Sequence, residues 1–140
     1  MGDMFSGMDI SASGLSAEKA RMDIISNNLA NANTTRGKDE KPYSRKMIIF
    51  SELLADKLNG DGKMGQGVKV DAVVESDAPF KRVYDPSHPD ADKDGFVEYP
   101  NVDPIKEMVD MITSTRAYEA NISAFNAAKM MANKALEMGK

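Results

Sequence analysis

The stretch that decides the fold is DPIKEMVDMITSTRAYEANISAFNAAKMMANKALEMGK, residues 103–140. Asp103 can cap a helix that begins here, Pro104 suits its first turn, and Gly139 can end it. The apolar residues recur in steps of three and four, which is the spacing of one helix face. Lys129 is the only strongly polar member of that seam, whose other residues are Met108, Met111, Thr115, Tyr118, Ile122, Phe125, Ala132 and Leu136. The pattern predicts one long helix packed along a partner helix.

A matching stripe near the amino terminus supplies that partner. Ala12 and Ile25 lie beside four residues that recur every seven positions, namely Met8, Leu15, Met22 and Leu29. This stripe predicts a helix from about residue 9 to residue 31, after a short glycine-containing lead over residues 1–7. Residues 1–35 are therefore expected to carry the N-terminal helix, and residues 101–140 the C-terminal helix, of one helical core domain. The two helices would pair as a coiled-coil-like hairpin.

The C-terminal helix is expected to carry a second apolar face beside the seam. Its members are mostly small: Val109, Ile112, Ala120, Ala124, Ala127 and Met131. A face that one partner helix cannot cover favours assembly between subunits, and a self-contained monomeric helical hairpin is the alternative. The residues predicted for the helix seam or a subunit interface are Met8, Leu15, Met22, Ile25, Leu29, Met108, Met111, Ile112, Tyr118, Ile122, Phe125 and Leu136.

Residues 36–100 change character and predict a small β-rich module inserted between the helices. Strands are expected within 43–50, at 68–75, at 80–84 and at 96–99, where β-branched and aromatic residues gather or alternate with polar ones. Residues 52–58 could extend the first strand or form a helical turn. Glycines mark a flexible loop over residues 59–67. The predicted fold class is therefore α+β.

Composition excludes several functions. The net charge is −4, so there is no basic surface for nucleic acid. Cysteine is absent, which removes disulfides and thiolate sites, and no apolar run reaches the roughly 20 residues that span a bilayer. The 11 methionines and absent tryptophan suit adaptable contacts between helices. Neither membrane insertion nor a cleaved secretion signal is expected.

The acidic run Asp90, Asp92, Asp94, Gly95 matches the start of a calcium-binding EF-hand loop. The bidentate glutamate that such a loop needs is replaced by Asn101, and prolines flank the run, so a solvated acidic turn is favoured over a calcium-binding module. His88 has no nucleophile and orienting partner around it, which favours a turn histidine. We therefore expect no enzyme activity, no metal site and no cofactor.

Residues 26–35 contain four asparagines within seven positions, at 27, 28, 31 and 33. Asparagine both donates and accepts hydrogen bonds, so a row of them near an interface can bond neighbouring backbone and fix register. A polar helix end explains the same composition equally well.

Several ordered motifs together resemble the bacterial flagellar basal-body rod and hook proteins, and among them the proximal rod proteins. The similarity runs from about residue 11 to residue 140. Its marks are SNNLANANTT (26–35), PYSRK (42–46), DPSHPDA (85–91), DGFV (94–97), YPNVD (99–103), EMVDMI (107–112) and RAYEAN (116–121). Signature residues implied by the resemblance are Asn27, Asn28, Asn31, Asn33, Thr34, Arg116, Glu119 and Asn121.

The resemblance implies a structural subunit that polymerises helically, transmits torque, lines the export channel and is needed for flagellum assembly and motility. The implied location is the basal-body rod in the periplasm, reached through the flagellar type III export apparatus without a cleaved signal. The implied partners are further copies, other proximal rod subunits, the basal-body adaptor protein FliE and the distal rod protein. A soluble helical export adaptor is the remaining alternative of another class.

Overall fold

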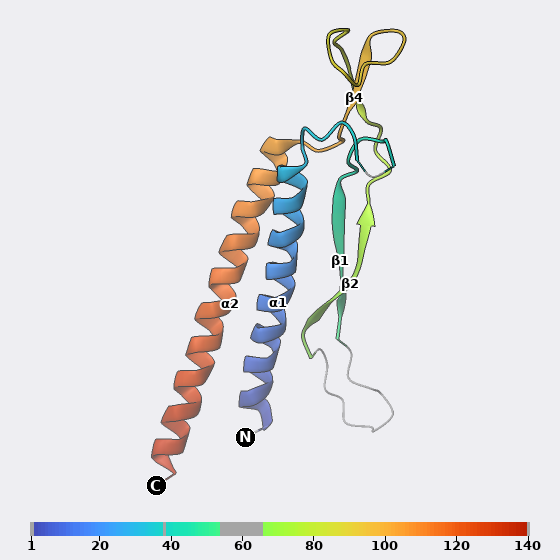
Figure 1. Ribbon diagram of the computed structural model, residues 1–140. Coiled ribbons are helices and arrows are strands. Elements are labelled where there is room, and N and C mark those ends of the chain that lie inside the picture. The colour runs from blue at the N-terminus through green and yellow to red at the C-terminus, as the bar shows by residue number, and fades with distance from the viewer. Residues whose placement is uncertain (1, 38, 54–65, 140) are drawn as a thin grey trace, which may run out of the picture.

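The computed structural model describes residues 2–37, 39–53 and 66–139. The elements follow in the order α1 (Gly2–Ala30), β1 (Lys46–Glu52), β2 (Val68–Glu75), β3 (Lys81–Tyr84), β4 (Phe96–Tyr99) and α2 (Pro104–Met138). Two long terminal helices pack together and two small antiparallel sheets lie between them in the chain (Figure 1). The predicted α+β class is confirmed.

Helix α2 has 35 residues and is about 52 Å long at 1.5 Å per residue. Its start follows the local chemistry, because the Asp103 carboxylate accepts hydrogen bonds from the backbone N–H groups of Ile105 and Lys106. Pro104 occupies the first turn, and Gly139 follows the last helical residue as its C-cap. These three expectations are confirmed.

Helix α1 begins at Gly2, seven residues before the predicted start. The expected lead over residues 1–7 is therefore wrong over the described residues 2–7. A glycine inside a helix costs only about 1 kcal/mol relative to alanine, too little to stop a helix that continues for many turns. Gly7 lies in open space, and its carbonyl accepts a hydrogen bond from the Ser11 hydroxyl at 3.0 Å.

Strands β1 and β2 form one ribbon, and β3 and β4 form another. The four expected strand regions are confirmed. A register shift between Ile49 and Phe50 bulges the first ribbon, because Ile49 pairs with Ala72 while Phe50 pairs with Val70. For residues 52–58, the sequence left open a longer first strand or a helical turn. Strand β1 includes Glu52 and ends there, and residues 54–65 lie outside the described part of the chain.

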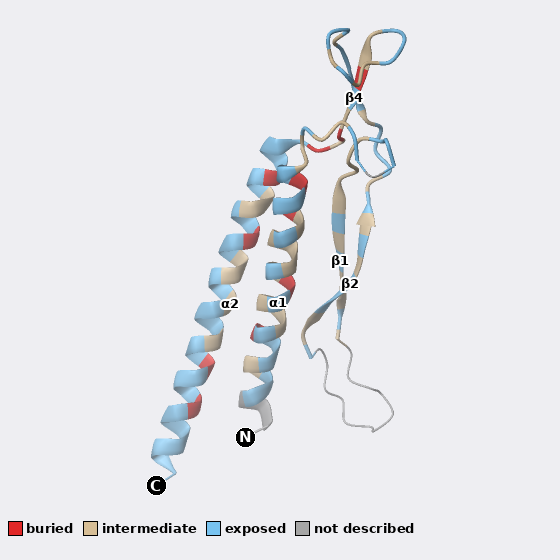
Figure 2. Cartoon of the chain, in the orientation of Figure 1, coloured by how far each residue is buried: buried red, intermediate tan, exposed pale blue. Residues whose placement is uncertain are grey.

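The long elements stack as three layers, with α1 in the middle. Helix α1 packs against α2 on one side and against the β1–β2 ribbon on the other (Figure 1). The buried apolar side chains are mostly small, and Figure 2 shows how few they are beside the exposed surface. They are Ala17, Ile25, Val97, Val102, Ala128 and Ala132. The helices therefore lie close together over a thin core.

The β3–β4 ribbon forms a separate arm at the end of the molecule where α1 ends and α2 begins (Figure 1). Val97, only 1% exposed, is its central residue. The Tyr84 and Phe96 rings meet edge to face at 5.2 Å, and the Arg82 guanidinium lies 4.8 Å from the centre of the Phe96 ring. The arm thus has its own small cluster of packed side chains.

Candidate assembly surface and the junction that positions it

Asn28 lies where α1, β1 and α2 meet, and is only 1% exposed. Its amide nitrogen donates to the Lys46 carbonyl at 2.8 Å and to the Glu107 carboxylate at 3.1 Å. Its oxygen accepts from the Lys46 N–H and from the Tyr43 hydroxyl, both at 2.9 Å. Both donor hydrogens and both acceptor positions are used, so this side chain fixes the end of α1 against the start of β1.

Glu107, in the first turn of α2, has no exposed surface. The Arg45 Nε donates to its Oε1 at 2.6 Å, and the same guanidinium lies 3.5 Å from the Asp110 carboxylate. A buried carboxylate needs such a partner, because taking an unpaired charge out of water costs several kcal/mol. The pair therefore holds the start of α2 to the segment that enters β1.

Asn101 extends this network to the arm. Its side-chain oxygen accepts from the Arg45 N–H at 2.7 Å. Its amide nitrogen donates to the carbonyls of Ser76 and Ala78 at 3.2 and 2.8 Å. We call Asn28, Tyr43, Arg45, Asn101 and Glu107 the junction, since together they join both helices, the β1–β2 ribbon and the two chain segments that lead to the arm.

Tyr43 completes the junction in its neutral form. Burial raises the pKa of its phenol, and the negative charges of Glu107 and Glu75 raise this pKa further. The hydroxyl therefore keeps its proton and donates it to Asn28.

Sequence patterns did not identify Arg45, Asn101 or Glu107 as positioning residues. A buried ion pair leaves no trace in hydrophobic periodicity, and Arg45 is 62 residues from Glu107. Their only signal is that each falls inside one of the family motifs quoted above.

On α2, five of the nine predicted seam positions are exposed. Eight buried or half-buried residues of α2 form two rows, Glu107, Ser114, Asn121, Ala128 and Met111, Tyr118, Phe125, Ala132, and Asp110 and Ala117 are half-buried as well. Met108, Ile122 and Leu136 are 48%, 38% and 57% exposed, and Thr115 and Lys129 are exposed as well. The first row lies one residue earlier than predicted. It contains Glu107, Ser114, Asn121 and Ala128 in place of the predicted Met108, Thr115, Ile122 and Lys129.

Close approach of the two helices explains this shift. A Cβ added to Gly14 of α1 would lie 3.0 Å from the Asn121 side chain, so there is room for little beyond hydrogen at that point. Small and polar residues such as Ser114 occupy the contact. Hydrophobic periodicity does not detect these residues and points to their large apolar neighbours instead. On α1, Ile25 is buried, Met8, Leu15 and Met22 are half-buried, and Leu29 and Ala12 are exposed.

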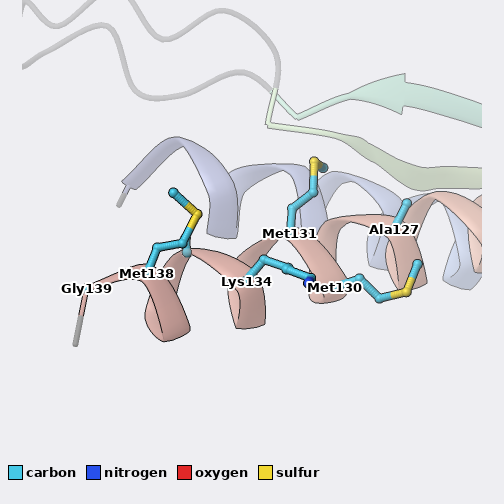
Figure 3. A pocket seen from close by; sticks show the side chains of 7 residues that line it. Ala127, Met130, Met131, Lys134, Met138 and Gly139 are labelled. Carbon is cyan, nitrogen blue, oxygen red and sulfur yellow. The ribbon is translucent and has the colours of Figure 1, made fainter.

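Helix α2 also carries a long exposed apolar face, which includes the predicted second face. We call it the outer stripe, and its members are Ile105, Val109, Ile112, Ala120, Ala124, Ala127, Met131 and Met138, all exposed. Towards the carboxyl end it becomes an open groove of about 650 Å³, with Met130, Met131 and Met138 along it (Figure 3).

Most signature asparagines serve the end of α1 itself. Asn27 and Asn31 donate to the backbone carbonyls four residues earlier, and the Thr34 hydroxyl donates to the Asn31 side chain at 3.2 Å. Asn33 is exposed. These four match a polar helix end, and among the signature asparagines of this segment Asn28 makes the side-chain bonds to α2 and β1.

The signature residues of α2 lie at different depths. Arg116 and Glu119 are exposed, whereas Asn121 is half-buried against Gly14. Asn121 also donates to the Ala117 carbonyl at 3.1 Å.

The acidic loop of the arm is occupied by internal hydrogen bonds. The Asp92 carboxylate accepts from the N–H groups of Asp94 and Phe96 and from Arg82, and these bonds hold the pKa of Asp92 below its usual value. Asp90 accepts from the Thr35 hydroxyl at 2.8 Å. Within the described ranges, no group of three or more His, Cys, Asp or Glu side chains is placed to hold a metal ion.

His88 lies in the turn before this loop, where its Nδ1 accepts from the Asp90 N–H at 3.1 Å. Its ring meets the Tyr99 ring at 6.2 Å. The expectation of a turn histidine is confirmed. Over the described residues, neither helix is apolar enough for long enough to cross a membrane.

Comparison with known proteins gives the family. The family described as "Flagella basal body rod protein" matches residues 8–37, and "Flagellar basal body rod FlgEFG protein C-terminal" matches residues 93–138. Flagellar basal-body rod protein FlgC of Bacillus subtilis is 50% identical, covering 97% of this chain and 98% of that protein. The FlgC of Salmonella typhimurium is 42% identical, covering 94% of this chain and 95% of that protein.

The FlgC of Aquifex aeolicus is 39% identical over the full length of both chains. The family models cover the two helical ends, and the relatives also cover the strands between them. The chain therefore belongs to the FlgC family of flagellar basal-body rod proteins, which are structural subunits of the rod and not enzymes.

Proposed function

We propose that this chain polymerises helically, with further copies and other rod subunits, into the proximal part of the rod. In that position it would transmit torque, surround the export channel and be required for flagellum assembly and motility. Membership of the rod family supports assembly with other rod subunits. The specific neighbours we propose are other proximal rod subunits, the adaptor protein FliE and the distal rod protein. Delivery to the periplasm would use the flagellar type III export apparatus without a cleaved signal.

One observation carries this proposal, and it is the outer stripe. Large apolar residues at both ends of the stripe are mostly exposed, with Ile105 at 72%, Ile112 at 56% and Met138 at 86%. Exposed apolar surface of this kind, here interrupted by Arg116 and Lys134, marks interaction sites. Small residues lie in its middle, where they permit another helix to approach closely.

The shape of the subunit agrees with such an assembly. We propose that the paired helices form the rod-core domain, from residues 1–35 and 101–140, and that residues 36–100 form a separate β-rich module. The junction fixes the angle between the two. Contacts between different surfaces of successive copies, if they do not close into a ring, generate a helical filament or tube.

Substitution on the outer stripe tests the proposal. Ile112→Asp and Ala124→Asp each place a charge on the stripe without touching the seam with α1. We expect both variants to fold as monomers and to be absent from purified basal bodies. The matched control is Asn133→Asp, which adds the same charge at an exposed position outside the stripe.

Incorporation and motility are both measured in cells that express only the variant. Incorporation of the two stripe variants at the level of the control would refute the interface. Loss of incorporation together with loss of the monomer fold, seen by circular dichroism, would place these residues in the monomer core instead, against their exposure in the structure.

A further inference from the structure

Strand β1 contains the run MIIF, in which no polar residue separates the apolar ones. An unbroken apolar run is typical of a strand that is covered on both faces. Helix α1 covers one face: the Arg21 guanidinium lies 4.6 Å from the centre of the Phe50 ring, and Ile48 is half-buried. The alternate residues Met47 and Ile49 are 36% and 45% exposed. The ribbon therefore has a second apolar face that the described chain leaves open.

Strand β2 extends this open face. Met47 pairs with Val74 and Ile49 pairs with Ala72, so both cross-strand pairs are wholly apolar. We call these four residues the ribbon face. Val73, which lies between two of them in the sequence, is exposed as well. Exposed apolar surface of this kind marks an interaction site.

The ribbon face and the outer stripe lie on opposite sides of the subunit. Helix α1 is the middle layer, with α2 on one side and the β1–β2 ribbon on the other (Figure 1). The two open apolar surfaces therefore bound the stack of three layers. When a second copy is set beside the first in the same orientation, the ribbon face of one meets the outer stripe of the other. Contact between two different surfaces of one chain can continue from copy to copy.

The bonds to α1 place the ribbon at a definite height along α2. At one end, the junction holds the start of β1 to the first turn of α2 at Glu107. At the other end, the Val68 N–H is bonded to the Ser13 hydroxyl, and the next residue of α1, Gly14, lies against Asn121. The ribbon is thus level with the stretch of α2 from Glu107 to Asn121. In a neighbouring copy at a similar height, it covers the half of the outer stripe nearest the junction.

The exposed charges at this height follow a complementary order. From the far end of the ribbon towards the junction, β2 presents Lys69 and then Asp71, while α2 presents Glu119 and then Arg116. All four side chains are exposed, and none of them is bonded or ion-paired to another described residue. The spacings are about 7 Å along the strand and about 4.5 Å along the helix, a difference that long side chains can bridge.

Both charges of the ribbon belong to its open face. Lys69 pairs with Ser51, which follows Ile49 by two residues and therefore lies on the same side of β1. Asp71 is the extra residue at the bulge, next to Ala72. The ribbon face therefore carries one positive and one negative charge beside its apolar pairs.

We propose that the outer stripe of one copy is covered by the ribbon face of a second copy of this chain. Arg116 then pairs with Asp71 of the neighbouring copy, and Glu119 pairs with its Lys69. The apolar surfaces supply the attraction, and the two charge pairs fix the relative height of the copies. The inference rests on the proposed function, because it requires copies in contact, and it names the surface that covers the outer stripe.

Charge reversal tests the pairing of Arg116 with Asp71. Arg116→Asp and Asp71→Arg each set like charges against one another in every contact between copies, so incorporation into basal bodies should fall about tenfold or more. The double variant exchanges the two charges, and its incorporation should return to within about threefold of the parent chain. Because both positions are exposed, the thermal midpoint of the monomer should change little.

The matched control combines Asp71→Arg with Lys129→Asp. It has the same net charge as the exchanged variant, and Lys129 is exposed on α2 outside the outer stripe. We expect no recovery of incorporation. Equal recovery in this control would overturn the charge pair, because net charge alone would then explain the result.

Disulfide formation tests the two faces, since the chain has no cysteine of its own. Ile49→Cys and Ile112→Cys are introduced together, and isolated basal bodies are treated with a mild oxidant. Helix α1 lies between the two positions within one subunit, and a disulfide needs Cα atoms within about 7 Å, so the bond forms between copies. We expect a ladder of dimers, trimers and longer species. Ile49→Cys with Asn133→Cys is the control and should give no links.

The outcomes separate this inference from the proposed function. Absence of the ladder, or dimers alone, would overturn the inference and leave the outer stripe as an interface with another rod subunit. A ladder without recovery in the exchanged variant would refute the charge pair. Normal incorporation of Ile112→Asp and Ala124→Asp would overturn the proposed interface itself. If the Ile49→Cys and Ile112→Cys variant fails to incorporate, Val73→Cys with Val109→Cys repeats the measurement from other exposed positions.

Discussion

Glu107 is charged and has no exposed surface, so its contribution to the stability of the fold depends on the partners that surround it. Replacing it with alanine leaves the mostly buried Arg45 without its closest partner and Asn28 with an unused donor. We expect Glu107→Ala to lower the free energy of unfolding by about 3 kcal/mol. Urea denaturation of the purified chain measures this. The exposed Glu119→Ala should change it by less than about 0.5 kcal/mol, and equal midpoints for the two variants would contradict the account.

Asp92 gives a prediction about pH. Hydrogen bonds from the Phe96 and Asp94 N–H groups and from Arg82 hold its pKa below the usual value of 3.8. A carboxyl whose pKa is lower in the folded chain stabilises the fold above its unfolded pKa, and this contribution is lost as the pH falls through the folded pKa. The arm should therefore keep this contribution at pH 5 and lose it as the pH falls below 3.8 and through the lower folded pKa.

Carboxyl chemical shifts followed by NMR from pH 6 to pH 2 measure the Asp92 pKa directly. A midpoint at or above the usual value would contradict the observed bonding.

At the scale of single residues, sequence predicts what depends on near neighbours. The Asp103 cap was predictable because its partners are two and three residues away. Glu107 was not, because its stabilising partners are Asn28 and Arg45, which are 79 and 62 residues away. Nothing in the local pattern distinguishes it from a solvated glutamate in a first turn.

At the scale of elements, the contact between α1 and the β1–β2 ribbon depends on a glycine. Gly67 has φ of +115°, and a Cβ there would meet the Ser13 hydroxyl that holds the Val68 N–H. Gly67→Ala should therefore destabilise the chain by about 2 kcal/mol. Gly7→Ala is the contrast, because Gly7 lies in a helix with open space around it and alanine there should stabilise by about 0.5–1 kcal/mol.

Thermal unfolding of the two glycine variants beside the parent chain gives the comparison. Shifts of opposite sign are expected. A Gly67→Ala variant as stable as the parent would mean that the ribbon can retreat from α1 without loss.

The elements themselves were largely predictable, and their faces less so. The second strand was predicted with both of its ends, because its residues alternate over a bounded segment. The seam of α2 was predicted on one row and displaced on the other, since Ser114 and Asn121 carry no apolar signal. Close packing of helices is achieved by small residues, and hydrophobic periodicity does not detect them.

At the scale of the whole molecule, we expect the last turns of α2 to change most when a free subunit assembles. In the isolated chain Leu136 is 57% exposed and Met138 is 86% exposed. We expect trypsin to cleave after Lys134 rapidly in the monomer and slowly in assembled rods. Timed digestion followed by mass spectrometry measures both rates, and the denatured chain gives the intrinsic rate at that bond. Equal rates in monomer and rod would remove this end of α2 from the interface.

The order of the layers determines when the helices can pack during synthesis. Synthesis starts at the amino terminus, yet α1 is the middle layer and its final neighbours on both sides come later in the chain. The bond between Asn28 and Glu107 closes a separation of 79 residues. Helix α1 therefore cannot complete its packing until α2 has been synthesised. Until then, the faces of α1 that pack against α2 and the β1–β2 ribbon are not both covered. The three-layer packing can therefore form only after the last helix of the chain has been made.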